Sequence, residues 1–247
     1  MSAPSQYPFI FGHRGASGYA PENTLSALEK ALTSGVKAIE VDAMITTDQH
    51  VIIFHDHKLD RCTSGQGNVR HSRWADIAEL DAGTWYNPGF SNQRVTHLNQ
   101  LIQLINEYPE VIVNIEIKPW FNNALTTTRL LVSTLKQQLI NPYRLIFSSF
   151  NMMALTALLR YWPSAYRAMN IDSRVPGAML LAKSLGCKAV HINQTEVTEN
   201  FVKQCHRMNL AVRCYTVNDP SRARQLLAMN IDGIFTDVPL DILDTIR

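Results

Sequence analysis

Two acidic residues stand close together in an apolar run near the N-terminus. Glu40 and Asp42 are two positions apart within Ala38–Ile45, so in a β-strand both carboxylates point to the same face. Burying two uncompensated carboxylates costs roughly several kcal/mol unless a cation or hydrogen-bond donors contact them. The pair is therefore typical of a metal-assisted acid–base site at a strand end. The plain structural alternative is a surface salt-bridge pair.

A second apolar run follows after a short polar segment, which predicts two strands joined by a tight turn. With Asp48-Gln49 at the centre of that turn, Asp42 lies opposite His55. Glu40 then lies opposite His57. Directly opposed Cβ atoms are about 4.5–5.5 Å apart, so this register predicts imidazoles within reach of the two carboxylates.

Charged side chains also stand at the ends of two other apolar runs. His13 and Arg14 follow the first run of the chain, and Glu116 and Lys118 end the run that begins at Val111. In parallel α/β barrels the reactive groups lie at the carboxyl ends of the strands. Charges at three successive strand ends favour a functional site over ion pairs that fill the interior.

The residue types indicate which chemistry this site would perform. Glu40, Asp42 and Glu116 offer oxygen ligands only, and hard divalent cations such as Mg²⁺, Ca²⁺ or Mn²⁺ prefer such a set. Arg14 and Lys118 would be out of place beside a cation unless an anion also binds there. A phosphate satisfies both requirements, because the metal and the two cationic side chains can all contact its oxygens.

Two histidines complete the candidate site. Imidazole titrates near neutral pH, so His13 and His55 are the expected acid–base pair. A single histidine at a strand end is more often a structural hydrogen-bonding group. Two of them beside an acidic triad favour catalysis.

The elements that position these residues alternate regularly along the chain. Short apolar runs followed by amphipathic helices predict βαβ units and a parallel sheet, and eight such units in 247 residues favour a closed (β/α)8 TIM barrel. The predicted strands are Phe9–Gly12, Ala38–Ile45, Val111–Ile117, Leu145–Ser148, Tyr166–Met169, Lys188–Ile192, Ala211–Thr216 and Gly233–Thr236. The predicted helices include Leu98–Glu107, Ala124–Gln138, Met152–Tyr161, Val175–Leu185, Glu196–Met208 and Ser221–Met229.

One region does not follow this alternation. Residues from about 57 to 97 are polar and interrupted by glycines and a proline. We expect a small insertion there, on the barrel rim after the second strand, within a single domain that spans residues 1–247.

Composition limits the classes of function. The formal net charge is +2 and the sequence pI is about 8.3, which argues against a nucleic-acid partner. We expect no signal peptide and no transmembrane segment, because the N-terminal residues lack a basic and apolar leader and no apolar run is long enough. The four cysteines show no CxxC spacing, so we expect free thiols and a cytoplasmic location. The sequence indicates no oligomeric state.

Five short motifs carry a resemblance to a known family. In chain order they are His13-Arg14-Gly15, Pro21-Glu22-Asn23-Thr24, Glu40-Val41-Asp42, His55-Asp56 and Glu116-Ile117-Lys118. With this order and strand context, the chain resembles the glycerophosphodiester phosphodiesterases over essentially its whole length. It looks most like the small cytosolic enterobacterial members that act beside glycerol 3-phosphate uptake.

The resemblance implies a TIM barrel that binds one divalent metal ion, Mg²⁺ or Ca²⁺, with Mn²⁺ as a further candidate. The roles it implies are metal ligands for Glu40, Asp42 and Glu116, catalytic acid and base for His13 and His55, and phosphate contacts for Arg14 and Lys118. Two positions depart from the family pattern. Asp48-Gln49 replaces the usual Asp-Gly turn, and Tyr215 stands where many members carry tryptophan.

The sequence therefore predicts metal-dependent hydrolysis of a small glycerophosphodiester to glycerol 3-phosphate and an alcohol. The attacking group is either the adjacent glycerol hydroxyl or water. One alternative is a zinc amidohydrolase-type barrel that uses His55 and His57, which form an H-x-H motif. The other is a non-catalytic barrel that binds a phosphorylated metabolite.

Overall fold

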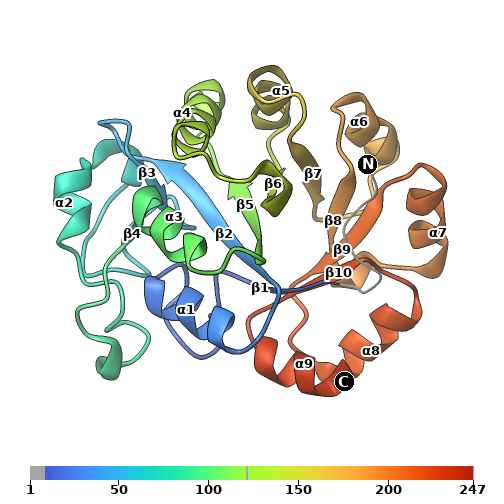
Figure 1. The fold of residues 1–247 in the computed structure, drawn as a ribbon, viewed down its shortest axis with the longest axis horizontal. Coiled ribbons are helices and arrows are strands. Elements are labelled where there is room, and N and C mark those ends of the chain that lie inside the picture. The colour runs from blue at the N-terminus through green and yellow to red at the C-terminus, as the bar shows by residue number, and fades with distance from the viewer. Residues whose placement is uncertain (1–8, 121, 247) are drawn as a thin grey trace.

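The computed structural model describes residues 9–120 and 122–246. Within them, strands β3 (Val51–Ile53) and β4 (Thr96–His97) pair antiparallel at one end of a ten-stranded sheet. The remaining strands are parallel and close into a barrel through pairing of the first two strands of the chain (Figure 1). The barrel strands are β1 (Phe9–Gly12), β2 (Ala38–Ile45), β5 (Ile112–Ile117), β6 (Leu145–Ser149), β7 (Tyr166–Ile171), β8 (Ala189–Asn193), β9 (Ala211–Tyr215) and β10 (Gly233–Thr236). The predicted (β/α)8 TIM barrel is confirmed.

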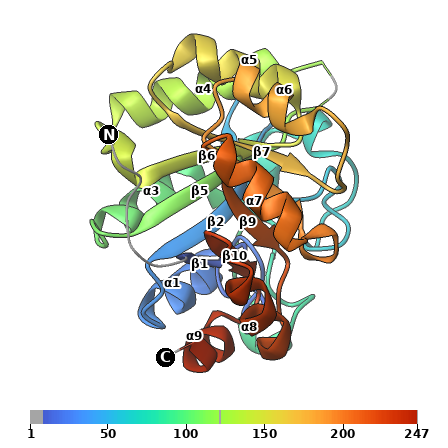
Figure 2. The same cartoon turned by 90° about the vertical axis from the view of Figure 1, so that its right-hand side faces the viewer.

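Helices cover the outside of the barrel. They are α1 (Leu25–Thr33), α3 (Leu98–Asn106), α4 (Ala124–Gln137), α5 (Met152–Tyr161), α6 (Ala178–Ser184), α7 (Glu199–Arg207), α8 (Pro220–Ala228) and α9 (Pro239–Ile246). In Figure 2 the strands lie between α4, α5 and α6 on one side and α1, α8 and α9 on the other. No helix in the described ranges is long and apolar enough to cross a bilayer.

Local backbone chemistry explains two helix starts that differ from the sequence-based prediction. Helix α6 begins three residues later than expected, after Gly177, whose φ of 82° is not helical. Helix α7 also begins three residues late, because the Thr198 side chain accepts a hydrogen bond from the Phe201 amide and caps the helix there. Both helices otherwise lie where the apolar periodicity placed them.

The core has two layers. Side chains on the outward face of the strands pack against the helices in one large cluster. Inside the barrel a smaller apolar cluster includes Phe11, Ile146 and Phe235. Because side chains alternate along each strand, the next inward positions toward the carboxyl ends hold polar residues, for example Asn114 and Glu116 after Ile112. The apolar cluster thus leaves the carboxyl half of the barrel interior to polar groups.

The segment between β3 (Val51–Ile53) and β4 (Thr96–His97) contains the short helix α2 (Trp74–Ala78) and packs on its own apolar cluster. It lies at the side of the barrel next to β2 (Figure 1). The cluster consists of Met44, Ile52, Phe54, Leu59, Cys62, Val69, Ile77, Ala82 and Val95. That residues of about 57–97 form an insertion within one domain stays a prediction.

The register of the β2–β3 hairpin differs by one residue from the predicted register. The Phe54 amide donates to the Asp42 carbonyl at 2.8 Å, so Asp42 lies opposite Phe54. The predicted opposition of Asp42 to His55, and with it that of Glu40 to His57, is therefore wrong.

The turn itself explains this shift. Gln49 has a φ of 67°, in the left-handed region, and the Thr46 amide donates to the His50 carbonyl at 3.0 Å. The loop therefore has three residues, a type I turn followed by a left-handed residue, instead of the two that were predicted. The Asp48 carboxylate stabilises it by accepting hydrogen bonds from the Thr46 hydroxyl and the Trp74 amide.

A buried arginine holds the amino-terminal face of the barrel together. Arg144, immediately before β6, donates to the carbonyls of Ile105, Tyr108 and Val111 at 2.8, 2.6 and 3.0 Å. These carbonyls belong to the end of α3 and the connection to β5, and those of Ile105 and Tyr108 also accept from the amides of Tyr108 and Val111, so the guanidinium adds a charged donor to each. This contact supports the fold at the end of the barrel opposite the carboxyl ends of the strands.

We expect Arg144→Met to lower the free energy of unfolding by roughly 2–4 kcal/mol, because buried carbonyls lose a charged donor. Urea denaturation measures the change. The matched control is Arg129→Met, which removes an exposed arginine from α4 and should change the free energy of unfolding by about 0.5 kcal/mol or less. Equal effects of the two variants would contradict this role.

Candidate active site

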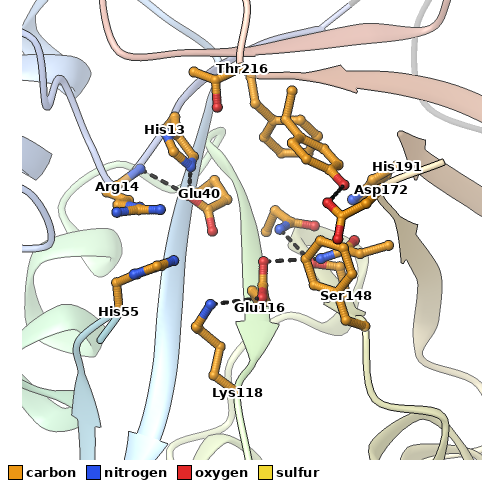
Figure 3. A pocket seen from close by; sticks show the side chains of 15 residues that line it. His13, Arg14, Glu40, His55, Glu116, Lys118, Ser148, Asp172, His191 and Thr216 are labelled. Atoms are coloured by element: carbon orange, nitrogen blue, oxygen red, sulfur yellow. Dashed lines mark hydrogen bonds and ion pairs between the residues drawn. The ribbon is translucent and has the colours of Figure 1, made fainter. Parts of the chain in front are cut away.

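A cavity of about 330 Å³ opens at the carboxyl end of the barrel. Six of the seven predicted site residues line it, and Asp42 is buried beside them. Figure 3 shows the labelled ones converging from β1, β2, β5 and the segment after β3. The lining residues of the predicted set are His13, Arg14, Glu40, His55, Glu116 and Lys118. The structure therefore brings the predicted site together.

Three carboxylates form the centre of this site. Asp42 and Glu116 are direct partners in the β2–β5 register, and Glu40 lies two residues earlier on the same face of β2. One oxygen from each of the three carboxylates lies within 4.8 Å of the others. In the described part of the chain no other group of three histidine, cysteine or acidic side chains is arranged in this way. An oxygen-only cluster of this size fits a hard divalent cation.

The pKa shifts of two of these carboxyl groups are consistent with a cation site. Burial, together with the negative charges of Asp42 and Glu116, raises the pKa of Glu40 well above its usual value. Burial also raises the pKa of Glu116 to about 7, against the opposing effect of Lys118. Both shifts favour the protonated carboxyl, and a metal ion that bound to these groups would displace their protons.

Asp42 differs from its two neighbours because donors surround it. Asn23 Nδ2 donates to its carboxylate at 2.9 Å, Arg14 Nε lies at 3.3 Å and Lys118 Nζ at 3.7 Å. Burial alone would raise its pKa, but these groups together with His55 lower it to about 2. Asp42 is thus the permanently ionised member of the cluster.

The two cationic side chains are held in place by acidic partners. Arg14 has a φ of 53°; its amide donates to Glu40 Oε2 at 2.9 Å and its guanidinium to Glu22 at 2.7 Å. Lys118 Nζ lies 3.3 Å from Glu116 Oε1. Both cations line the cavity, so an anion that enters it meets them directly.

Each of the two histidines is oriented by a carboxylate. His13 Nδ1 lies 2.6 Å from Asp237 Oδ1, and His55 Nδ1 lies 2.6 Å from Asp56 Oδ1. An ionised carboxylate only accepts, so Nδ1 is the donor in both pairs, and Nε2 of the neutral ring is left able to accept a proton. Burial lowers the pKa of His55, and the hydrogen bond from His13 helps to hold the pKa of Asp237 below its usual value despite burial.

Sequence reasoning missed the partners that orient these groups. Asp237 reaches His13 because β10 pairs with β1 when the barrel closes, and its place at the end of the last strand was the available signal. Glu22 accepts from Arg14 and also from Arg61 at 2.7 Å. His57, the second residue of the H-x-H motif, is exposed and stacks on Trp120 with ring centroids 4.0 Å apart.

The remaining lining residues divide into an inner and an outer group. The inner group is buried inside the barrel and consists of Asn114, Ser148, Asn170, His191 and Phe235. The outer group surrounds the opening and includes Phe150, Asp172 and Tyr215. Tyr215 Oη donates to the Ile171 carbonyl at 2.7 Å and lies 3.0 Å from Asp172 Oδ1. These two contacts fix the Tyr215 side chain at the opening of the cavity and tie it to the end of β7.

Clustered acids, flanking cations and oriented histidines lie at the carboxyl end of a (β/α)8 barrel. This arrangement is typical of enzymes that cleave phosphate esters with the help of a metal ion. Comparisons with known proteins specify the family. The model of the glycerophosphoryl diester phosphodiesterase family matches residues 13–241. The chain belongs to this family and is thus an enzyme that hydrolyses phosphoric diesters.

Individual relatives match this chain over nearly their whole lengths. The glycerophosphodiester phosphodiesterase of Caldanaerobacter subterraneus is 27% identical, covering 96% of this chain and 97% of that protein. That of Bacillus altitudinis is 28% identical, covering 93% and 94%. A solved Oleispira antarctica phosphodiesterase, in complex with its product sn-glycerol 3-phosphate, is 33% identical with a TM-score of 0.94, covering 100% of this chain and 99% of that one.

The acidic cluster generates a prediction about stability. With Mg²⁺ or Ca²⁺ at 100 times its dissociation constant, the free energy of unfolding should increase by about 2.7 kcal/mol. This increase corresponds to a rise in melting temperature of roughly 5–10 °C. Glu40→Gln, which replaces the carboxyl with a neutral group of the same shape, should lose most of this gain. The control Glu29→Gln, exposed on α1, should keep it. Thermal denaturation with chelator or metal measures the gain, and an undiminished gain in Glu40→Gln would contradict the assignment.

The same cluster predicts a pH dependence. The pKa of Glu116 is raised to about 7 and that of Glu40 is raised as well, so the metal-free protein is stabilised by these groups at low pH and loses that stability as the pH rises through the raised values. Metal must displace their protons, so the metal-induced gain should be larger at pH 8 than at pH 6. Melting curves at the two pH values check the sign; a gain that is equal at both would refute it.

Proposed function

We propose that the enzyme hydrolyses glycerophosphodiesters to glycerol 3-phosphate and a free alcohol, with one divalent cation held by Glu40, Asp42 and Glu116. The observation that carries the proposal is the meeting of three carboxylates within 4.8 Å of one another in a cavity also lined by two cations and two carboxylate-bound histidines. The oxygen-only donors favour Mg²⁺ or Ca²⁺, with Mn²⁺ as a further candidate. The Oleispira protein that binds sn-glycerol 3-phosphate supports the choice of product.

Arg14 and Lys118 bind the phosphodiester. Both line the cavity beside the acidic cluster, where their charges stabilise the negative charge that grows on the phosphoryl oxygens. A bound cation supplies further neutralisation of the same oxygens. Glu22 accepts a hydrogen bond from the Arg14 guanidinium, and Asp42 Oδ2 lies 3.3 Å from its Nε, so the guanidinium is oriented before substrate arrives.

His13 and His55 carry out proton transfer. Each ring donates from Nδ1 to a carboxylate, which favours the neutral tautomer with Nε2 unprotonated. Nε2 of His13 lies 4.0 Å from Glu40 Oε2. One histidine removes a proton from the attacking hydroxyl or water, and the other protonates the oxygen of the departing alcohol. Asp237 and Asp56 favour the protonated imidazole that forms in the first of these steps.

The two alternative readings of the sequence have less support. A zinc site at the H-x-H motif needs His57 beside His55, yet His57 stacks on Trp120 and is not among the residues that line the cavity. A barrel that only binds a phosphorylated metabolite has no need of two histidines that are each held by a carboxylate.

The direct test is release of glycerol 3-phosphate from glycerophosphocholine by the purified protein. We expect release that stops on chelation and returns with Mg²⁺ or Ca²⁺ but not with Zn²⁺ alone. An enzyme-coupled assay of glycerol 3-phosphate follows the product. Full activity after exhaustive chelation, or recovery with Zn²⁺ only, would rule out the proposed metal site.

A second test concerns the histidines. His13→Ala and His55→Ala should each lower turnover by roughly 10²–10⁴-fold, because each removes a general acid or base. The control is His57→Ala, which removes an exposed ring outside the cavity and should leave turnover within about 3-fold of wild type. Near-normal turnover in either of the first two variants takes that residue out of the mechanism.

A further inference from the structure

One arginine outside the cavity joins two carboxylates that orient groups of the site. Arg61 donates from Nε and Nη2 to the two oxygens of Asp56 at 2.7 and 2.9 Å. It also donates from Nη1 and Nη2 to the two oxygens of Glu22 at 2.7 and 2.8 Å. Both contacts are bidentate, which gives an arginine–carboxylate pair a defined geometry. The guanidinium therefore fixes the two carboxylates relative to each other.

Each of these carboxylates also holds a group that lines the cavity. Asp56 Oδ1 lies 2.6 Å from His55 Nδ1, and Glu22 Oε1 accepts from the Arg14 guanidinium at 2.7 Å. Arg61 itself is not among the residues that line the cavity. Its contacts therefore reach a bound substrate only through His55 and Arg14.

The charge of Arg61 favours the ionised form of both acceptors. Hydrogen bonds from Arg61 are the main cause that holds the pKa of Asp56 below its usual range. Burial would raise the pKa of Glu22, but Arg61 and Arg14 together hold it below its usual value. An ionised carboxylate only accepts hydrogen bonds, so Asp56 favours the His55 tautomer that carries its proton on Nδ1.

The backbone around Arg61 is anchored in the segment between β3 and β4. Leu59 and Cys62, which flank Arg61 in the chain, are 3% and 4% exposed in the apolar cluster of this segment. The guanidinium carbon lies 5.8 Å from the centroid of the Trp85 ring. The plain structural alternative is that Arg61 only ties this segment to the loop that contains Glu22.

We propose that Arg61 is a positioning residue for the reaction. Its guanidinium holds Asp56 and Glu22, which in turn hold His55 for proton transfer and Arg14 for contact with the phosphate. This inference rests on the proposed function, which assigns those roles to His55 and Arg14. Arg61 thereby couples the group that moves a proton to the group that binds the phosphate.

The first measurement is turnover of glycerophosphocholine by Arg61→Ala with saturating Mg²⁺. The value of kcat/KM should fall by roughly 10–100-fold, because groups that orient a site residue have effects of this size. The matched control is Arg73→Ala, which removes another arginine of the same segment. Its Nε lies 3.9 Å from Asp48 Oδ2, outside the cavity, so its kcat/KM should stay within about 3-fold of wild type. An equally small change in Arg61→Ala overturns the proposal.

The second measurement is an NMR titration of the His55 imidazole, which does not depend on activity. Removal of the guanidinium leaves the charge of Asp56 unopposed beside His55, so the pKa of His55 should be higher in Arg61→Ala than in wild type. The other charged groups that act on His55 are unchanged in this variant; they are Asp42, Arg14 and Lys118. Lowered turnover with an unchanged titration of His55 means that Arg61 only ties down its segment, and overturns the proposal.

A second variant, Arg61→Lys, serves if Arg61→Ala does not fold. Lysine keeps the charge but cannot form two bidentate contacts, so kcat/KM should still fall by about 10-fold. Wild-type turnover in a folded Arg61→Lys overturns the proposal as well. If wild type releases no glycerol 3-phosphate, the proposed function fails, whereas the NMR titration still decides whether Arg61 acts on His55.

Discussion

The structure depends on keeping three carboxylates close together in the interior of a barrel. Glu40, Asp42 and Glu116 are brought within 4.8 Å of one another by parallel strand pairing alone. Arg14 and Lys118 compensate chiefly Asp42, which stays ionised, whereas the pKa values of the other two are raised. The protein therefore folds around a centre that is short of positive charge, at the place where we propose that a divalent cation binds.

Much of this arrangement follows from the sequence, because the carboxyl ends of parallel strands must meet. The alternation of apolar runs and helical periodicity predicted the barrel, and Glu116 could be placed beside Asp42 once both were at strand ends. The β2–β3 register could not be predicted, since it depends on Gln49 adopting a left-handed conformation. The pairing of His13 with Asp237 could have been inferred only through barrel closure, which makes neighbours of two residues 224 positions apart.

The lining of the cavity illustrates the same limit. Asn114 and Asn170 have no signature in the sequence that marks them as more than polar residues in strands, and only the closed barrel shows that both line the cavity.

The bond between His13 and Asp237 joins the first strand of the barrel to the residue after the last. A ribosome has therefore made nearly the entire chain before the imidazole of His13 acquires its orienting carboxylate. The three acids, by contrast, are all present once β5 has emerged. A nascent or C-terminally shortened chain therefore contains the three acids and the His55–Asp56 pair before it contains the carboxylate that orients His13, so loss of the last strand would remove the orientation of one imidazole and leave that of the other.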